Sequence, residues 1–91
     1  MKVIHKHTLL LQQYQYIDSF NGAKFLDIQA QDGIPNMWVE VDDEKLSDRF
    51  HLIIVGTGHP VPTGSFYLAT YQNVPFVWHF YTSSRRFANG E

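Results

Sequence analysis

Apolar and polar residues alternate with a period of two along much of the chain, and this pattern constrains the fold more than any other feature. Residues 24–31 show it clearly, with Leu26, Ile28 and Ala30 on one side and Asp27, Gln29 and Gln31 on the other. Successive side chains of a β-strand point to opposite faces, so the alternation is typical of strands with one buried face. Evidence for helices is poor. The sequence therefore predicts an all-β fold with little or no helix.

Residues 24–31 and 36–42 are predicted to form a β-hairpin. The second segment alternates in the same way, with Met37, Val39 and Val41 against Glu40 and Asp42. Asp32-Gly33 lies between the two segments, and this dipeptide readily adopts the positive φ values of a tight hairpin turn. Because Pro35 has no amide hydrogen to donate, we expect it at the start of the second strand or on a sheet edge.

Five further segments are predicted to be strands. After its first residue, Arg49, the segment 49–55 is apolar on both faces, with His51 as the one polar interruption, which is typical of a central strand covered on both sides. The other four segments are residues 3–8, 14–17, 65–72 and 76–81. About six to seven short strands, separated by Gly, Pro, Asn and Asp residues, indicate a small antiparallel β-sandwich or barrel.

The length of the chain, 91 residues, fits one domain, because two separate cores would each bury too little surface to be stable. We expect residues 1–82 to form a single β domain and residues 83–91 to form a polar C-terminal tail that frays. Residues 42–48 are charged and are expected to form a solvated loop. Apolar residues make up 44% of the chain and charged residues 18%, which is the composition of a folded domain.

Composition also excludes several classes of function. The chain has no cysteine, so disulfide bonds, thiolate catalysis and cysteine-based metal sites are excluded. The net charge of −2 argues against general binding to nucleic-acid backbones. No apolar run approaches the roughly 20 residues that span a bilayer, and residues 1–7 lack the apolar stretch of a signal peptide. We therefore expect a cytoplasmic protein that does not bind membranes.

Two segments are distinctive when they are taken together. Residues 22–38 read GAKFLDIQAQDGIPNMW and residues 56–62 read GTGHPVP, and aromatic-rich strand segments follow at residues 67–72 and 77–80. This arrangement resembles a family of short uncharacterised phage and prophage proteins, with a GAK strand, a G-x-P-x-x-W hairpin and a GTGHP loop. The resemblance extends over about residues 1–81. It implies a phage or prophage origin, and hence the host cytosol, but it implies no activity.

Residues 56–64, GTGHPVPTG, are the most unusual stretch of the chain. Glycine permits positive φ, proline stiffens the loop, and backbone N–H groups in such a turn can surround an anion. Thr57, Gly58 and His59 are therefore candidates to bind a phosphate, carboxylate or carbonyl group. The alternative is a tight corner between two strands, in which the glycines serve geometry alone. The segment is no known glycine-rich nucleotide motif, because neither the Gly-Lys-Ser/Thr spacing nor a following helix is present.

Trp38 and the arginines near the C-terminus are further candidate ligand-binding residues. Trp38 should point away from Met37 and toward the face that carries Glu40, where a large exposed ring suits stacking on a base. Arg85 or Arg86 would neutralise the charge of a nucleotide-like ligand. The alternative for Trp38 is that a second layer or a second subunit covers it.

Aromatic residues make up 15% of the chain, enough to fill a core and to leave rings for a surface. Tyr14 and Tyr16 are expected to share one strand face, and Tyr67 and Tyr71 another. Exposed aromatic faces and unprotected strand edges favour association between subunits. We therefore expect a homo-oligomer.

The histidines allow two interpretations. His5 and His7 are two residues apart and share a strand face, so a third, distant histidine would complete a divalent metal site. No Asp/Glu–His spacing supports this, and we expect no metal. His51 and His79 are expected to be partly buried and hydrogen-bonded. Because no catalytic motif is present, and so short a chain offers few walls for a closed active site, we expect no enzyme and no cofactor.

These features favour a small non-enzymatic binding protein of phage origin. It would sequester a small anionic, nucleotide-like ligand or occupy a host protein, as in counter-defence or host takeover. Its candidate ligand-binding residues are Thr57, Gly58, His59, Trp38 and Arg85. Two alternatives stay open: a structural or scaffold protein that works as a symmetric homo-oligomer, and a small His-dependent hydrolase or metal enzyme.

Overall fold

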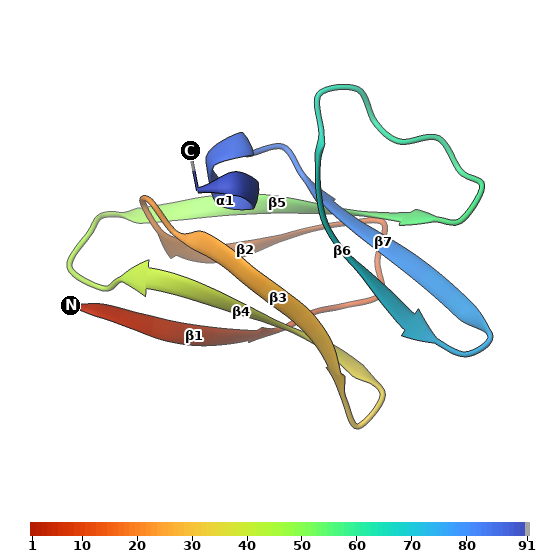
Figure 1. Cartoon of the computed structure of the whole chain (residues 1–91). Coiled ribbons are helices and arrows are strands. Elements are labelled where there is room, and N and C mark those ends of the chain that lie inside the picture. The colour runs from red at the N-terminus through yellow and green to blue at the C-terminus, as the bar shows by residue number, and fades with distance from the viewer. Residues whose placement is uncertain (91) are drawn as a thin grey trace.

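The computed structural model describes residues 1–90 and contains seven antiparallel strands and one short helix (Figure 1). The strands are β1 (Lys2–Thr8), β2 (Tyr14–Phe20), β3 (Lys24–Gln31), β4 (Ile34–Asp42), β5 (Ser47–Gly56), β6 (Phe66–Asn73) and β7 (Phe76–Thr82), and the helix is α1 (Arg85–Asn89). A three-stranded sheet has the order β1-β4-β3, and a four-stranded sheet has the order β2-β5-β7-β6. Two separate sheets make a β-sandwich, so the all-β prediction is confirmed and the barrel alternative is wrong.

The core lies between the two sheets. The three-stranded sheet contributes Met37 and Val39 of β4, which are completely buried. The four-stranded sheet contributes Leu52 of β5 and Phe80 of β7, which are completely buried as well. Residues of both sheets form one continuous apolar cluster. Each side chain of this size contributes about 1.5–3 kcal/mol when it leaves water, so the alternating pattern of the sequence has a direct energetic basis.

The β3–β4 hairpin forms as predicted. Asp32 and Gly33 both have positive φ, of 52° and 75°, and they connect Gln31 to its cross-strand partner Ile34. Pro35 lies at the start of β4, before the pairing with β1 begins, so its missing amide hydrogen breaks no ladder on that side.

A β-bulge in β3 changes the faces that the alternation predicted. The register with β4 shifts between Phe25 and Asp27. As a result Phe25 packs against the core, whereas Leu26 is 39% exposed. The predicted position of Leu26 on the buried face beside Ile28 is therefore wrong, because an extra residue in one strand reverses every face that follows it.

A second bulge, in β6, separates two tyrosines that the sequence placed together. The register with β7 shifts between Tyr67 and Ala69. Tyr71 is consequently buried, with its hydroxyl donating to the carbonyl oxygen of Gly33 at 2.7 Å, while Tyr67 stays on the surface. Their predicted shared face is wrong, whereas Tyr14 and Tyr16 do lie on one exposed face of β2.

β5 is an interior strand of its sheet, as predicted, but it is not covered along both faces. Leu52 and Ile54 are buried in the core. On the other face His51 is exposed, Ile53 is half-buried and Val55 is buried. The outer face is therefore covered only at the end of the strand, and the prediction of a partly buried His51 is wrong.

Residues 84–90 pack as part of the domain instead of fraying after residue 82. Ser84 caps α1 by accepting a hydrogen bond from the amide of Phe87 at 3.2 Å, and Gly90 ends the helix in the left-handed conformation. Phe87 is completely buried and stacks on Phe50, with ring centroids 4.6 Å apart. Phe87, together with the partly buried Ala88, packs the helix against the core. No helix within residues 1–90 is long and apolar enough to cross a membrane.

Candidate functional site

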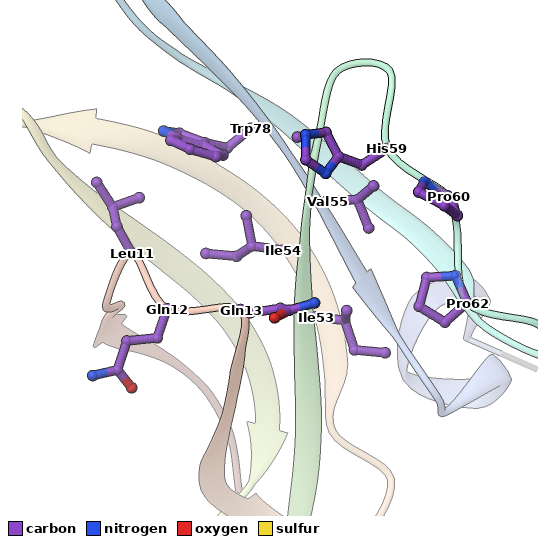
Figure 2. A pocket seen from close by; sticks show the side chains of 11 residues that line it. Leu11, Gln12, Gln13, Ile53, Ile54, Val55, His59, Pro60, Pro62 and Trp78 are labelled. Atoms are coloured by element: carbon purple, nitrogen blue, oxygen red, sulfur yellow. The ribbon is translucent and has the colours of Figure 1, made fainter.

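A cavity of about 460 Å³ lies at the edge of β5 (Figure 2). β2 pairs with β5 only as far as Ile53, and the amide of Ile54 then donates to the carbonyl oxygen of Gln13 at 2.9 Å. β5 continues to Gly56 with β7 as its paired neighbour. The cavity occupies the space beside this overhang, between the β1–β2 loop and the loop that follows β5.

The walls of this edge cavity are mainly apolar. Figure 2 shows Leu11, Ile54 and Trp78 on one side of the strand and Ile53, Val55, Pro60 and Pro62 on the other. Polar side chains come from Gln12, Gln13 and His59, and no Lys, Arg, Asp or Glu is among the described residues that line the cavity. Ligand pockets of small molecules have volumes of about 300–1,000 Å³ and similar walls with a few polar groups, so this cavity is a candidate binding site.

Gly56 and Gly58 shape the loop that carries His59. The amide of His59 donates to the carbonyl oxygen of Gly56 at 3.0 Å, which closes a tight turn. Gly58 in this turn has φ of +87°, a value that side chains of L residues rarely adopt. A Cβ atom at Gly56 would lie 3.4 Å from His59 Cδ2 and 3.6 Å from Trp78 Cζ3. The glycine therefore leaves room for both rings beside the cavity.

The Thr57 hydroxyl lies at the outer face of the four-stranded sheet, and Thr57 does not line the edge cavity. Its Oγ1 lies 3.0 Å from Nε2 of His79, and Nδ1 of His79 lies 2.9 Å from Oγ1 of Thr70. Thr70 Oγ1 in turn lies 2.7 Å from the hydroxyl of Tyr67. The expected half-buried, hydrogen-bonded state of His79 is confirmed, and Thr57 uses its hydroxyl to hold the loop on the sheet.

Trp38 and Arg85 do not line the edge cavity. Trp38 points away from Met37, as predicted, and lies on the outer face of the three-stranded sheet between Lys6 and Asp27. Arg85 is the exposed first residue of α1. Of the five residues singled out from the sequence, the structure thus places His59 in the cavity wall and Thr57 and Gly58 in the supporting loop.

Trp78 is one of several cavity residues that were not predicted from the sequence as site residues. Alternation along residues 76–81 places Trp78 on the same strand face as Phe76 and Phe80, a pattern typical of a core. Only Phe80 is fully buried, Trp78 is half-buried, and Phe76 is exposed and stacks on Trp78 with ring centroids 5.7 Å apart. The Nε1 atom of Trp78 is buried without a hydrogen-bond partner among residues 1–90. The only signal in the sequence is that this strand face carries more aromatic residues than the core buries.

His5 and His7 share the inner face of β1, as predicted, and both are half-buried. Burial lowers the pKa of His7 below its ordinary value, and the nearby His5 adds to the effect. Nε2 of His7 is buried and has no hydrogen-bond partner within residues 1–90. The described part of the chain contains no group of three His, Asp or Glu side chains that could hold a metal ion.

Fold and cavity together define a small antiparallel β-sandwich domain with a ligand-sized cavity at the end of one strand. A protein-family model described as Domain of unknown function (DUF7352) matches residues 1–90, and the chain belongs to that family. The matched range includes α1, in agreement with the packing of this helix on the core. No curated protein and no solved structure matches the chain.

Proposed function

We propose that this domain is a small non-enzymatic binding protein whose ligand occupies the edge cavity. The observation that supports the proposal is the cavity itself, which combines a volume of about 460 Å³ with apolar walls and a few polar groups. Binding needs only such a preformed, shaped surface. Catalysis would also need a reactive group aimed into the cavity, and His59 is the one titratable side chain that residues 1–90 contribute to its lining.

The lining favours an uncharged apolar or aromatic group as the part of the ligand that enters. A phosphate inside the cavity would meet no Lys or Arg side chain, and an unpaired buried charge is costly. A nucleotide-like ligand would therefore insert its base and leave its charged groups outside. Trp78 takes the stacking role that the sequence assigned to Trp38, because its ring borders the cavity.

The same chemistry suits an apolar side chain of a host protein. The resemblance of the chain to short phage and prophage proteins supports this form of the proposal, in which the domain acts in the host cytosol in counter-defence or host takeover. An inserted side chain would contact Leu11 and Trp78, with Gln13 and His59 available for hydrogen bonds to its backbone.

A thermal-shift experiment with nucleosides, nucleotides and cyclic nucleotides tests the small-ligand form. A ligand of the edge cavity should stabilise the wild type and lose its effect in Leu11→Ser, whereas Leu10→Ser is a matched control. Both leucines are about half exposed, but only Leu11 lines the edge cavity. Arg85→Ala should bind like the wild type. The absence of stabilisation by every compound would remove the small-ligand form, and a pull-down from host lysate with wild type and Leu11→Ser tests the host-protein form.

A symmetric homo-oligomer is a second candidate, favoured by one feature of the outer face. A row of cross-strand neighbours runs over all four strands of the larger sheet, and its members are Tyr14, Ile53, Tyr81 and Tyr67. Tyr14 and Tyr67 are each more than half exposed, and a second copy would cover them. Light scattering should then show an assembly that Tyr14→Lys dissociates, and a strictly monomeric wild type would contradict this candidate.

A further inference from the structure

A second cavity, of about 380 Å³, lies beside the N-terminus and the end of α1. It shares no lining residue with the edge cavity. Four cationic residues line it: Lys2 from β1, Lys24 from β3, Lys45 from the β4–β5 turn and Arg86 from α1. They are four of the seven Lys and Arg residues of a chain whose net charge is −2. More than half of the Lys and Arg residues of the chain therefore line this cationic cleft, together with the carboxylates of Glu40 and Asp42.

The two carboxylates in the lining of the cationic cleft already have cationic partners. Glu40 lies 3.9 Å from Nζ of Lys2. Asp42 lies 3.1 Å from the N-terminal amine and accepts a hydrogen bond from the amide of Glu44 at 3.1 Å. Within residues 1–90, Lys24, Lys45 and Arg86 form no ion pair. Three cations from separate elements thus line one cleft, and none of them forms an ion pair with a carboxylate of residues 1–90, although Glu40 is the cross-strand neighbour of Lys24 and Asp42 lies near Lys45.

We propose that the cationic cleft binds a phosphoryl group carried as a diphosphate or a small phosphomonoester. Like charges held together in one hollow repel each other, and a multiply charged anion relieves that repulsion. Lys supplies point charges and Arg supplies a planar fork of donors, which is the combination that phosphate oxygens accept. The Asn21 side chain and the exposed turn at Gly22, with φ of +79°, complete the rim with uncharged groups.

The docking of α1 positions the arginine of this site. Phe87 is buried, and Gly90 lies beside Lys24, so that a Cβ atom at Gly90 would be 3.5 Å from Lys24 Cε. Arg86 lines the cleft as a consequence, whereas Arg85, one residue earlier on the same helix, does not. The site does not depend on any ligand of the edge cavity. It uses different residues, and these include four cations, whereas the lining of the edge cavity is mainly apolar.

Calorimetric titration with pyrophosphate at constant ionic strength tests the proposal. The wild type should show saturable binding with one site, and Arg86→Gln and Lys45→Gln should each weaken it about tenfold, since each removes one charge-assisted hydrogen bond. Arg85→Gln and Lys6→Gln are matched controls that lower the net charge equally outside the cleft, and they should leave affinity within about twofold.

All four substituted side chains are exposed, so the variants should unfold at the temperature of the wild type, and this is measured first. No saturable binding by the wild type would overturn the proposal. An equal loss of affinity in Arg86→Gln and Arg85→Gln would also overturn it, because the effect would then be general charge screening instead of a site. A titration with sodium acetate should give no saturable binding, and binding as tight as that of pyrophosphate would show a carboxylate site instead.

Discussion

Oγ1 of Thr57 lies 3.0 Å from Nε2 of His79, and this contact fastens the loop after β5 to the outer face of the sheet. His79 is itself held through Nδ1 by Thr70 at 2.9 Å. The loop contributes His59, Pro60 and Pro62 to the edge cavity. A hydroxyl on the outer face of the sheet thus holds the loop that forms one wall of the edge cavity.

Thr57→Val should loosen this loop while leaving the fold intact. The substitution removes a hydrogen bond at an exposed position, so the free energy of unfolding should fall by about 1 kcal/mol or less. Amide hydrogen exchange at residues 58–64 should become faster. Thr63→Val, in the same loop but without a side-chain hydrogen bond to the described residues, is the control. Equal exchange in both variants would mean that the Thr57–His79 contact does not hold the loop.

Phe87→Ala should strongly destabilise the domain. Phe87 is completely buried and stacks on Phe50 at 4.6 Å, and truncation of a buried phenylalanine costs about 3–5 kcal/mol. Phe76→Ala is the comparison, because Phe76 is 56% exposed and its loss should cost less than about 1 kcal/mol. Urea unfolding measures both variants. A Phe87→Ala variant as stable as the wild type would support the frayed tail that the sequence predicted.

Stability should fall on acidification because of His7. Burial lowers the pKa of this side chain in the folded state below the ordinary value of 6.5, so the unfolded chain binds a proton first as the pH falls. The free energy of unfolding should therefore be unaffected by His7 above about pH 6.5, and it should decrease below that value until the folded-state pKa is reached. Urea unfolding across this range should give a shallower dependence for His7→Gln than for the wild type. The same pH dependence in His7→Gln and the wild type would contradict this prediction.

The strands and the β3–β4 hairpin could be predicted because they depend on neighbours in sequence. The two bulges could not, since the shift at Phe25 and that at Tyr67 are set by pairing with other strands. The burial of Phe87 was equally hidden, because its partner Phe50 is distant in the sequence. Local pattern therefore located the elements, and tertiary packing decided which faces and ends they present.

The candidate sites followed the same division. The unusual loop was found from its glycines and prolines, and His59 does line a cavity. The cavity itself arises because β5 extends past the end of its pairing with β2, a difference in strand length that no motif records. Because of that overhang, one cavity is lined by Trp78, Leu11 and His59. The cationic cleft likewise gathers Lys24 and Arg86 from opposite parts of the chain.

The two tryptophans allow the central claim to be tested in one measurement. Trp78 borders the edge cavity, whereas Trp38 lies on the outer face of the other sheet. Nitrogen–proton correlation spectra of the ¹⁵N-labelled protein show one indole resonance for each, and these are followed during titration with indole, phenol and adenosine. At least one compound should shift the Trp78 resonance saturably, together with the amides of Gln13 and His59, and leave Trp38 in place. No shift at Trp78, or equal shifts at both tryptophans, would contradict a binding function for the edge cavity.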